Sequence, residues 1–78
     1  MELHVWWVTN PPNLAQYYPV ESVEEAMGKL KELTDAELLD SSVYSNAGGL
    51  EVFEDGGWTE YYDDEGRDID EIMAERSE

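Results

Sequence analysis

The groups that could perform catalysis in this chain of 78 residues are one histidine and 20 carboxylates, because cysteine is absent. A catalytic nucleophile needs a base beside it, and the single histidine, His4, lies within an expected strand. We interpret His4 as a packed structural residue. Carboxylate pairs can perform acid–base chemistry, but 20 of them in 78 residues make chance neighbours unavoidable. The glycine pairs also lack the Lys-Ser/Thr of a phosphate-binding loop, so the sequence predicts that the protein is not an enzyme.

The acidic stretch 63–71 has the composition of a calcium-binding loop. An EF-hand loop requires carboxylates at positions 1, 3 and 5, glycine at 6 and glutamate at 12. With Gly66 at position 6, Asp63 and Glu65 fall at positions 3 and 5, but Tyr61 falls at position 1 and Ile72 at position 12. Two ligands are missing, so the sequence predicts no dedicated metal site, and we expect no cofactor.

The segment 48–66 combines the densest charge with aromatic side chains. Strand-forming and aromatic residues alternate with carboxylates, and Asp55-Gly56 has the composition of a hairpin turn. We interpret this hairpin as an interface, with aromatic anchors inside an acidic rim that faces a groove rich in Lys and Arg. The alternative is a hairpin surrounded by ordinary solvated glutamates. The predicted partner-binding residues, called the acidic surface below, are Glu51, Glu54, Asp55, Trp58, Glu60, Tyr61, Tyr62, Asp63, Asp64, Glu65, Asp68, Asp70 and Glu71.

Two registers of this hairpin are open. With a two-residue turn, Phe53 faces Trp58 and Glu51 faces Glu60, which sets like charges opposite each other. With a three-residue turn, Glu54 faces Trp58 instead. Both registers place carboxylates next to large aromatic rings.

The charge of the chain is strongly one-sided. Twenty Asp and Glu oppose four Lys and Arg, for a formal net charge of -16. Residues 1–50 carry eight acids and two bases, whereas residues 51–78 carry twelve acids and two bases. Such a surface repels nucleic acid and anionic membranes and attracts basic proteins. Carboxylates on a rigid hairpin and helix can approximate the phosphates of a duplex, which carry about one charge per 1.7 Å of axis.

These residues are positioned by an expected α+β fold in a single domain, residues 1–78. We expect a small antiparallel sheet of three to four strands, one main helix packed across it, and a short C-terminal helix. The segment 1–9 alternates as a strand, and one of its faces carries Leu3, Val5, Trp7 and Thr9. Trp6 and Trp7 must then point to opposite sides, one into the core and the other against a helix or into solvent.

The main helix is expected to begin at Ser22, which has capping-box spacing to Glu25. An apolar stripe runs from Val23 to Leu33. The segment 34–37 repeats the capping spacing and predicts a short second helical turn through Leu39. The alternative is that a strand already begins there.

The remaining segments are expected to connect these elements. We expect a loop over 14–20, because proline disfavours helix in the residue before it, a short edge strand over 41–45, and a turn or bulge over 46–49. Asp68 has N-cap spacing to Glu71 and predicts a terminal helix over 68–76. The alternative is a short strand over 67–69.

The apolar run Val5-Trp6-Trp7-Val8 is too short for a membrane span or for the apolar region of a signal peptide. The absence of cysteine fits a reducing compartment. We therefore expect a soluble, cytoplasmic protein that has no membrane partner and does not bind nucleic acid directly.

The segment 46–56 and the tail from Trp58 to Glu71 resemble small acidic proteins carried by phages and mobile elements. Among these are anti-CRISPR and anti-restriction inhibitors, several of which act as DNA mimics. The resemblance implies an inhibitor in the host cytoplasm that occupies the nucleic-acid channel of a CRISPR effector or restriction complex. The alternatives are an antitoxin or immunity protein that neutralises a basic nuclease, or an acidic domain without a dedicated partner. A monomer and a dimer are both open.

Overall fold

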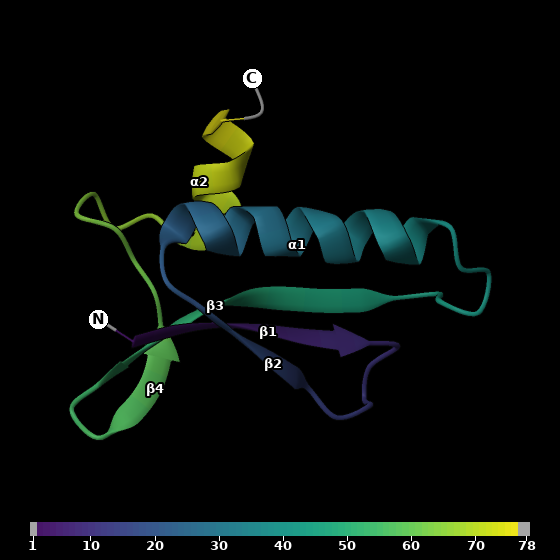
Figure 1. Ribbon diagram of the computed structural model, residues 1–78, viewed down its shortest axis with the longest axis horizontal. Helices are drawn as coiled ribbons and strands as arrows, with labels where there is room; N and C mark the ends of the chain where they lie inside the picture. The colour runs from purple at the N-terminus through teal and green to yellow at the C-terminus, as the bar shows by residue number, and fades with distance from the viewer. Residues whose placement is uncertain (1, 77–78) are drawn as a thin grey trace.

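The computed structural model describes residues 2–76, in which four strands and two helices follow the order β1-β2-α1-β3-β4-α2 (Figure 1). The strands form one antiparallel sheet in the order β2-β1-β3-β4. They span Glu2–Thr9 (β1), Gln16–Val20 (β2), Asn46–Glu54 (β3) and Gly57–Glu60 (β4). Helix α1 (Val23–Leu38) runs across one face of the sheet, and the short α2 (Ile69–Arg76) stands upright beside α1 (Figure 1). The predicted α+β fold is confirmed.

The core lies between this face of the sheet and the two helices. Alternate residues of β1 point into it, as the sequence predicts, and Val5 and Leu50 are completely buried. Trp7 is the core tryptophan, and Trp6 lies half-buried on the opposite face of the sheet. The buried cluster consists of Leu3, Val5, Trp7, Val20, Ala26, Leu30, Leu50, Val52 and Ile69. Ile69 is the first residue of α2, so the core also anchors the C-terminal helix.

Strand β2 corrects the prediction of a loop over 14–20. Gln16–Val20 pairs with β1, with Val20 opposite Leu3. Pro19 is tolerated because β2 is an edge strand, where the missing N–H can face solvent instead of a neighbouring strand. Its presence therefore does not exclude a strand.

Helix α1 begins as predicted and continues further than predicted. The Glu25 N–H donates to Ser22 Oγ at 3.1 Å, which confirms the N-cap. The predicted separate turn at 34–39 is wrong, because α1 continues without interruption to Leu38. The Thr34 hydroxyl donates to the Leu30 carbonyl oxygen at 2.8 Å, so it is satisfied inside the helix and does not cap a new one.

Strand β3 corrects two further predictions. Residues 41–45 form a loop and not an edge strand, and 46–49 is the start of β3 and not a turn. The glycines there serve close packing on β1: a Cβ on Gly49 would lie 2.6 Å from Trp6 Nε1, and one on Gly48 would collide with the Trp7 ring. Glycine is therefore needed in this strand for the approach of two indoles.

The hairpin and the terminal helix follow the local signals. Strands β3 and β4 pair in the two-residue register, with Phe53 opposite Trp58, so the three-residue alternative is wrong. Asp55 and Gly56 have φ of 54° and 81°, as a type I′ turn requires. The Glu71 N–H donates to Asp68 Oδ1 at 2.9 Å and confirms the N-cap of α2, which excludes the alternative strand.

Neither helix in the described part of the chain is both long and apolar enough to cross a membrane.

Candidate functional site

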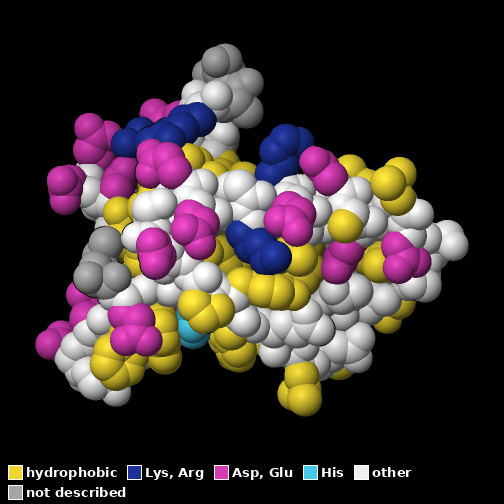
Figure 2. Space-filling model, in the orientation of Figure 1, with side chains coloured by type: hydrophobic (Ala, Val, Ile, Leu, Met, Phe, Trp, Pro, Cys, Tyr) yellow, Lys and Arg dark blue, Asp and Glu magenta, His cyan; other side chains and the backbone are white. Residues whose placement is uncertain are grey.

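The acidic surface occupies one end of the molecule. It comprises the β3–β4 hairpin, the loop that follows β4, and the first turn of α2. Asp and Glu side chains gather at this end, over the hairpin and over the loop that rises to α2 (Figure 2). The fold therefore brings together residues that are spread over positions 51–71 of the sequence.

The positive charges lie away from the hairpin, and each has an acidic partner. The pairs within residues 2–76 are Lys29 with Glu32, Lys31 with Asp35, Arg67 with Asp63, Glu65 and Glu75, and Arg76 with Glu24. All four cations belong to α1, to α2 or to the loop between β4 and α2. Their charges therefore do not neutralise the hairpin.

Asp63 organises the loop before α2. Its Oδ1 accepts the backbone N–H groups of Glu65 and Arg67, each at 2.9 Å, and its Oδ2 accepts Arg67 Nε at 2.9 Å. The Arg67 backbone donor, helped by the Arg67 guanidinium and the Glu65 N–H, outweighs desolvation and lowers the pKa of Asp63. The same contact and a bond to Glu75 raise the pKa of Arg67. Asp63 therefore has a structural role that the sequence did not indicate.

Other predicted carboxylates also have internal partners. Asp68 caps α2, and Glu71 reaches back to the Asp68 N–H at 3.5 Å. Glu51 accepts a hydrogen bond from His4 at 2.7 Å. The predicted carboxylates that form neither an ion pair nor a helix-capping hydrogen bond within residues 2–76 are Glu54, Asp55, Glu60, Asp64 and Asp70, and all five are exposed. These five remain available to a partner.

The second part of the site is the face of the sheet turned away from both helices (Figure 1). Strand alternation and the pairing register determine which side chains lie on it. This open sheet face carries Glu2, His4, Trp6, Val8, Tyr17, Pro19, Ala47, Gly49, Glu51, Phe53, Trp58 and Glu60. It contains five rings, two carboxylates of the acidic surface, and no Lys or Arg among the described residues.

Four of these rings, those of His4, Tyr17, Phe53 and Trp58, form a contiguous cluster around His4. The Trp58 indole stacks on the imidazole, with centroids 3.6 Å apart and 14° between the planes. The Tyr17 ring, on the neighbouring strand β2, lies with its centroid 4.8 Å from that of the imidazole. The Phe53 and Trp58 rings pack edge to face, with their centroids 5.3 Å apart. His4 itself is only 9% exposed, with its Nε2 bonded to Glu51 and to no hydroxyl group among residues 2–76.

The outer rings of the cluster remain accessible. Trp58 is 37% exposed, Phe53 41% and Tyr17 58%. Of the other two predicted anchors, Tyr62 is exposed, whereas Tyr61 is half-buried against the core.

Sequence reasoning identified Trp58 and missed the rest of the ring cluster. The alternation of β1 and the two-residue hairpin register were signals for His4 and Phe53, because both positions share a face with Trp58. Tyr17 could be placed only once β2 was recognised as a strand.

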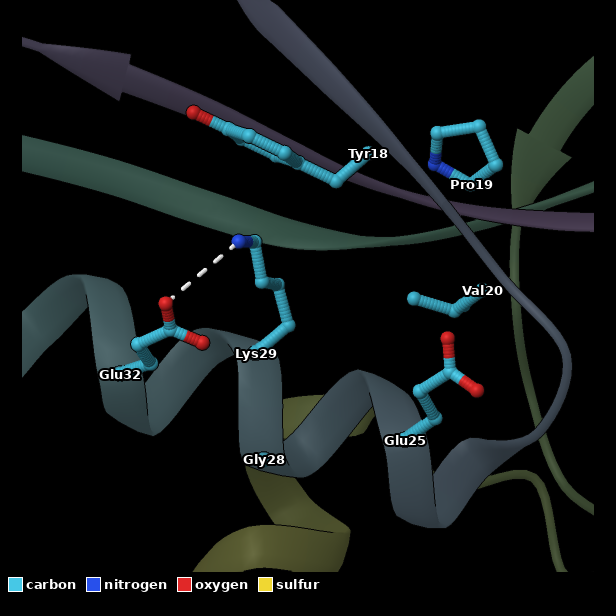
Figure 3. Close-up of a pocket in the computed structure, with 7 residues that line it drawn as sticks. All are labelled: Tyr18, Pro19, Val20, Glu25, Gly28, Lys29 and Glu32. Atoms are coloured by element: carbon cyan, nitrogen blue, oxygen red, sulfur yellow. Dashed lines mark ion pairs between the residues drawn. The ribbon is translucent and has the colours of Figure 1, made fainter.

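A groove of about 600 Å³ between β2 and α1 is a separate hollow (Figure 3). Lys29 reaches from α1 toward the Tyr18 ring, 4.5 Å from its centroid, and also pairs with Glu32 (Figure 3). The lining contains no histidine, serine or threonine that could form a nucleophile–base pair. In addition, no group of three or more His, Asp or Glu side chains within residues 2–76 is arranged to hold a metal ion.

Comparison with known protein families, with curated proteins and with solved structures gives no match to this chain.

Proposed function

We propose that this protein is a non-enzymatic, cytoplasmic inhibitor whose acidic surface occupies the nucleic-acid-binding surface of a basic host protein. The resemblance to small acidic phage proteins supplies the setting, which is inhibition of a CRISPR effector or a restriction complex. Such an inhibitor needs no metal and no cofactor. It acts by competing with nucleic acid for the same positive groove.

The observation that carries the proposal is the separation of charge over the surface. Each Lys and Arg is paired on the helices or on the loop before α2, whereas Glu54, Asp55 and Glu60 on the hairpin have no cationic partner among residues 2–76. The carboxylates of the hairpin are therefore not neutralised by neighbouring cations. A positive groove attracts such a surface over long range and aligns it on approach.

The hairpin is suited to present these charges. Its Asp55-Gly56 turn has the backbone conformation that a two-residue hairpin requires. Residues 51–53 of the hairpin also pair with β1, so the base of the hairpin is anchored in the sheet. A preorganised surface loses little conformational entropy when it binds.

A capture experiment with matched variants tests the proposal. The immobilised protein is incubated with nuclease-treated bacterial lysate, and bound proteins are eluted with duplex DNA. The test variant E54Q/D55N removes two charges from the hairpin, and Asn-Gly preserves the turn. The control E32Q/D35N removes two charges from the distal half of α1.

We expect basic nucleic-acid-binding proteins to be captured and then released by the DNA. Two exposed charge pairs contribute about 0.2–1 kcal/mol each, so E54Q/D55N should bind such a protein about 2- to 30-fold more weakly, and the control should bind it like the unmodified protein. Captured proteins that duplex DNA does not release, or equal loss in both variants, would overturn the proposal. Capture of a nuclease toxin would identify an immunity function instead.

A further inference from the structure

We propose that the open sheet face is a docking site for an arginine side chain of the basic partner, with the Trp58 indole as the plate on which the guanidinium stacks. This inference rests on the proposed function. It assigns a specific side-chain contact, which the net charge of the protein alone does not identify. It also adds residues of β1, β2 and β3 to the interface.

The Trp58 indole is held in place by neighbouring rings. One face of its indole is covered by the His4 imidazole, 3.6 Å away, and Phe53 meets it edge to face. Trp58 is nevertheless 37% exposed, and the guanidinium is assigned to the indole face that the imidazole does not cover. An indole held in this way offers its π-face without first having to be ordered.

The charged side chains near the Trp58 ring are carboxylates. Glu60 lies on the same face two residues along β4, and it stands directly opposite Glu51. Like charges in opposite positions destabilise a sheet, and Glu51 has only His4 as a partner within residues 2–76. A cation placed over Trp58 would meet the negative face of the ring and relieve this repulsion.

Arginine fits this arrangement better than lysine. A guanidinium is planar, weakly hydrated and able to stack on an aromatic ring, whereas an ammonium is a compact and strongly hydrated charge. Cation–π contacts are strongest on tryptophan and involve arginine more often than lysine. The open sheet face should therefore distinguish two partners of equal charge.

The same charges disfavour other occupants. A second copy of this chain would set Glu51 and Glu60 against like charges, at a net charge of -16 for each protein. Nucleic acid would be repelled for the same reason. Large exposed apolar patches on soluble proteins mark interaction sites, and only a positive partner matches the acidic rim of this face.

The test uses blocked oligoarginine and oligolysine peptides of equal length, titrated into the full chain near neutral pH and low salt. The dissociation constants are measured by calorimetry, and the indole N–H resonances of the three tryptophans are followed by NMR. We expect the arginine peptide to bind about two- to five-fold more tightly. Its addition should shift the Trp58 resonance and leave that of the buried Trp7 unchanged.

Variants separate stacking from charge. Trp58→Leu keeps an apolar cover over His4 and should abolish the preference for arginine without weakening the lysine peptide. Tyr44→Ala removes an exposed ring from the loop before β3 and should preserve the preference. E54Q/D55N should weaken both peptides by the same factor.

Three results would overturn the inference. Equal affinities for the two peptides, with or without a Trp58 shift, would remove the arginine site and leave the proposed function standing. A dimer in sedimentation experiments that Trp58→Leu dissociates would assign the face to a second copy. Failure of both peptides to bind at low salt would instead overturn the proposed function itself.

Discussion

The Glu37 carboxylate is the polar contact whose loss should most clearly weaken the scaffold. Its Oε2 accepts the Trp7 indole N–H at 2.9 Å and the Thr9 hydroxyl, and its Oε1 accepts the Asn46 amide at 3.3 Å. The end of α1 is thereby tied to the ends of β1 and β3. Burial raises the pKa of Glu37, but the three donors outweigh it and lower the pKa below its ordinary value of 4.5.

Glu37→Gln keeps the shape of this side chain and removes its charge. A hydrogen bond to a charged group contributes about 1.5–3 kcal/mol, against about 0.5–1.5 kcal/mol for a neutral one. Trp7 and Thr9 can still donate to the remaining oxygen, so we expect a loss of about 1–2 kcal/mol in the free energy of unfolding. In a domain of this size that corresponds to a melting temperature lowered by about 4–16 °C.

Urea and thermal unfolding, followed by circular dichroism over a series of pH values, test this prediction. Because the pKa of Glu37 is lowered in the folded protein, its stabilising effect is present above about pH 4.5 and lost as the pH falls. The stability difference between the protein and Glu37→Gln should therefore shrink in acid. The control Glu32→Gln breaks only an exposed pair with Lys29 and should change stability by less than about 0.5 kcal/mol. A difference that stays constant down to about pH 3 would refute the reasoning.

Two further substitutions test the packing and the charge of the sheet by urea unfolding. Gly49→Ala places a Cβ 2.6 Å from Trp6 Nε1 and should destabilise the protein by about 1–3 kcal/mol. In the control Gly57→Ala the new Cβ meets nothing within 4 Å, so the change in stability should be close to zero. Equal effects of the two substitutions would show that the Trp6 ring moves aside. Glu60→Gln removes the like charge opposite Glu51 and should stabilise the protein by about 0.2–1 kcal/mol, less at high salt. A loss of stability would mean that Glu60 has a favourable contact in the free protein.

Features that depend on neighbours a few positions away could be predicted from the amino-acid sequence. Ser22 and Asp68 start their helices because a side-chain oxygen reaches an N–H three residues later. Asp55-Gly56 sets the hairpin register because these residues accept positive φ. Alternation along β1 identifies the core face. These signals were enough to predict the α+β fold and the position of the acidic hairpin.

Features that depend on residues distant in the sequence became visible only in the folded protein. Pro19 can sit in a strand because β2 lies at the edge of the sheet, and Gly49 belongs to a strand because the Trp6 ring packs on it. Asp63 is engaged internally by Arg67, whereas Glu54 remains without a cationic partner among residues 2–76. The ring cluster around His4 joins all four strands, which loops and a helix separate in the sequence. Composition states how many charges and rings the chain carries, but strand pairing determines which of them face a partner together.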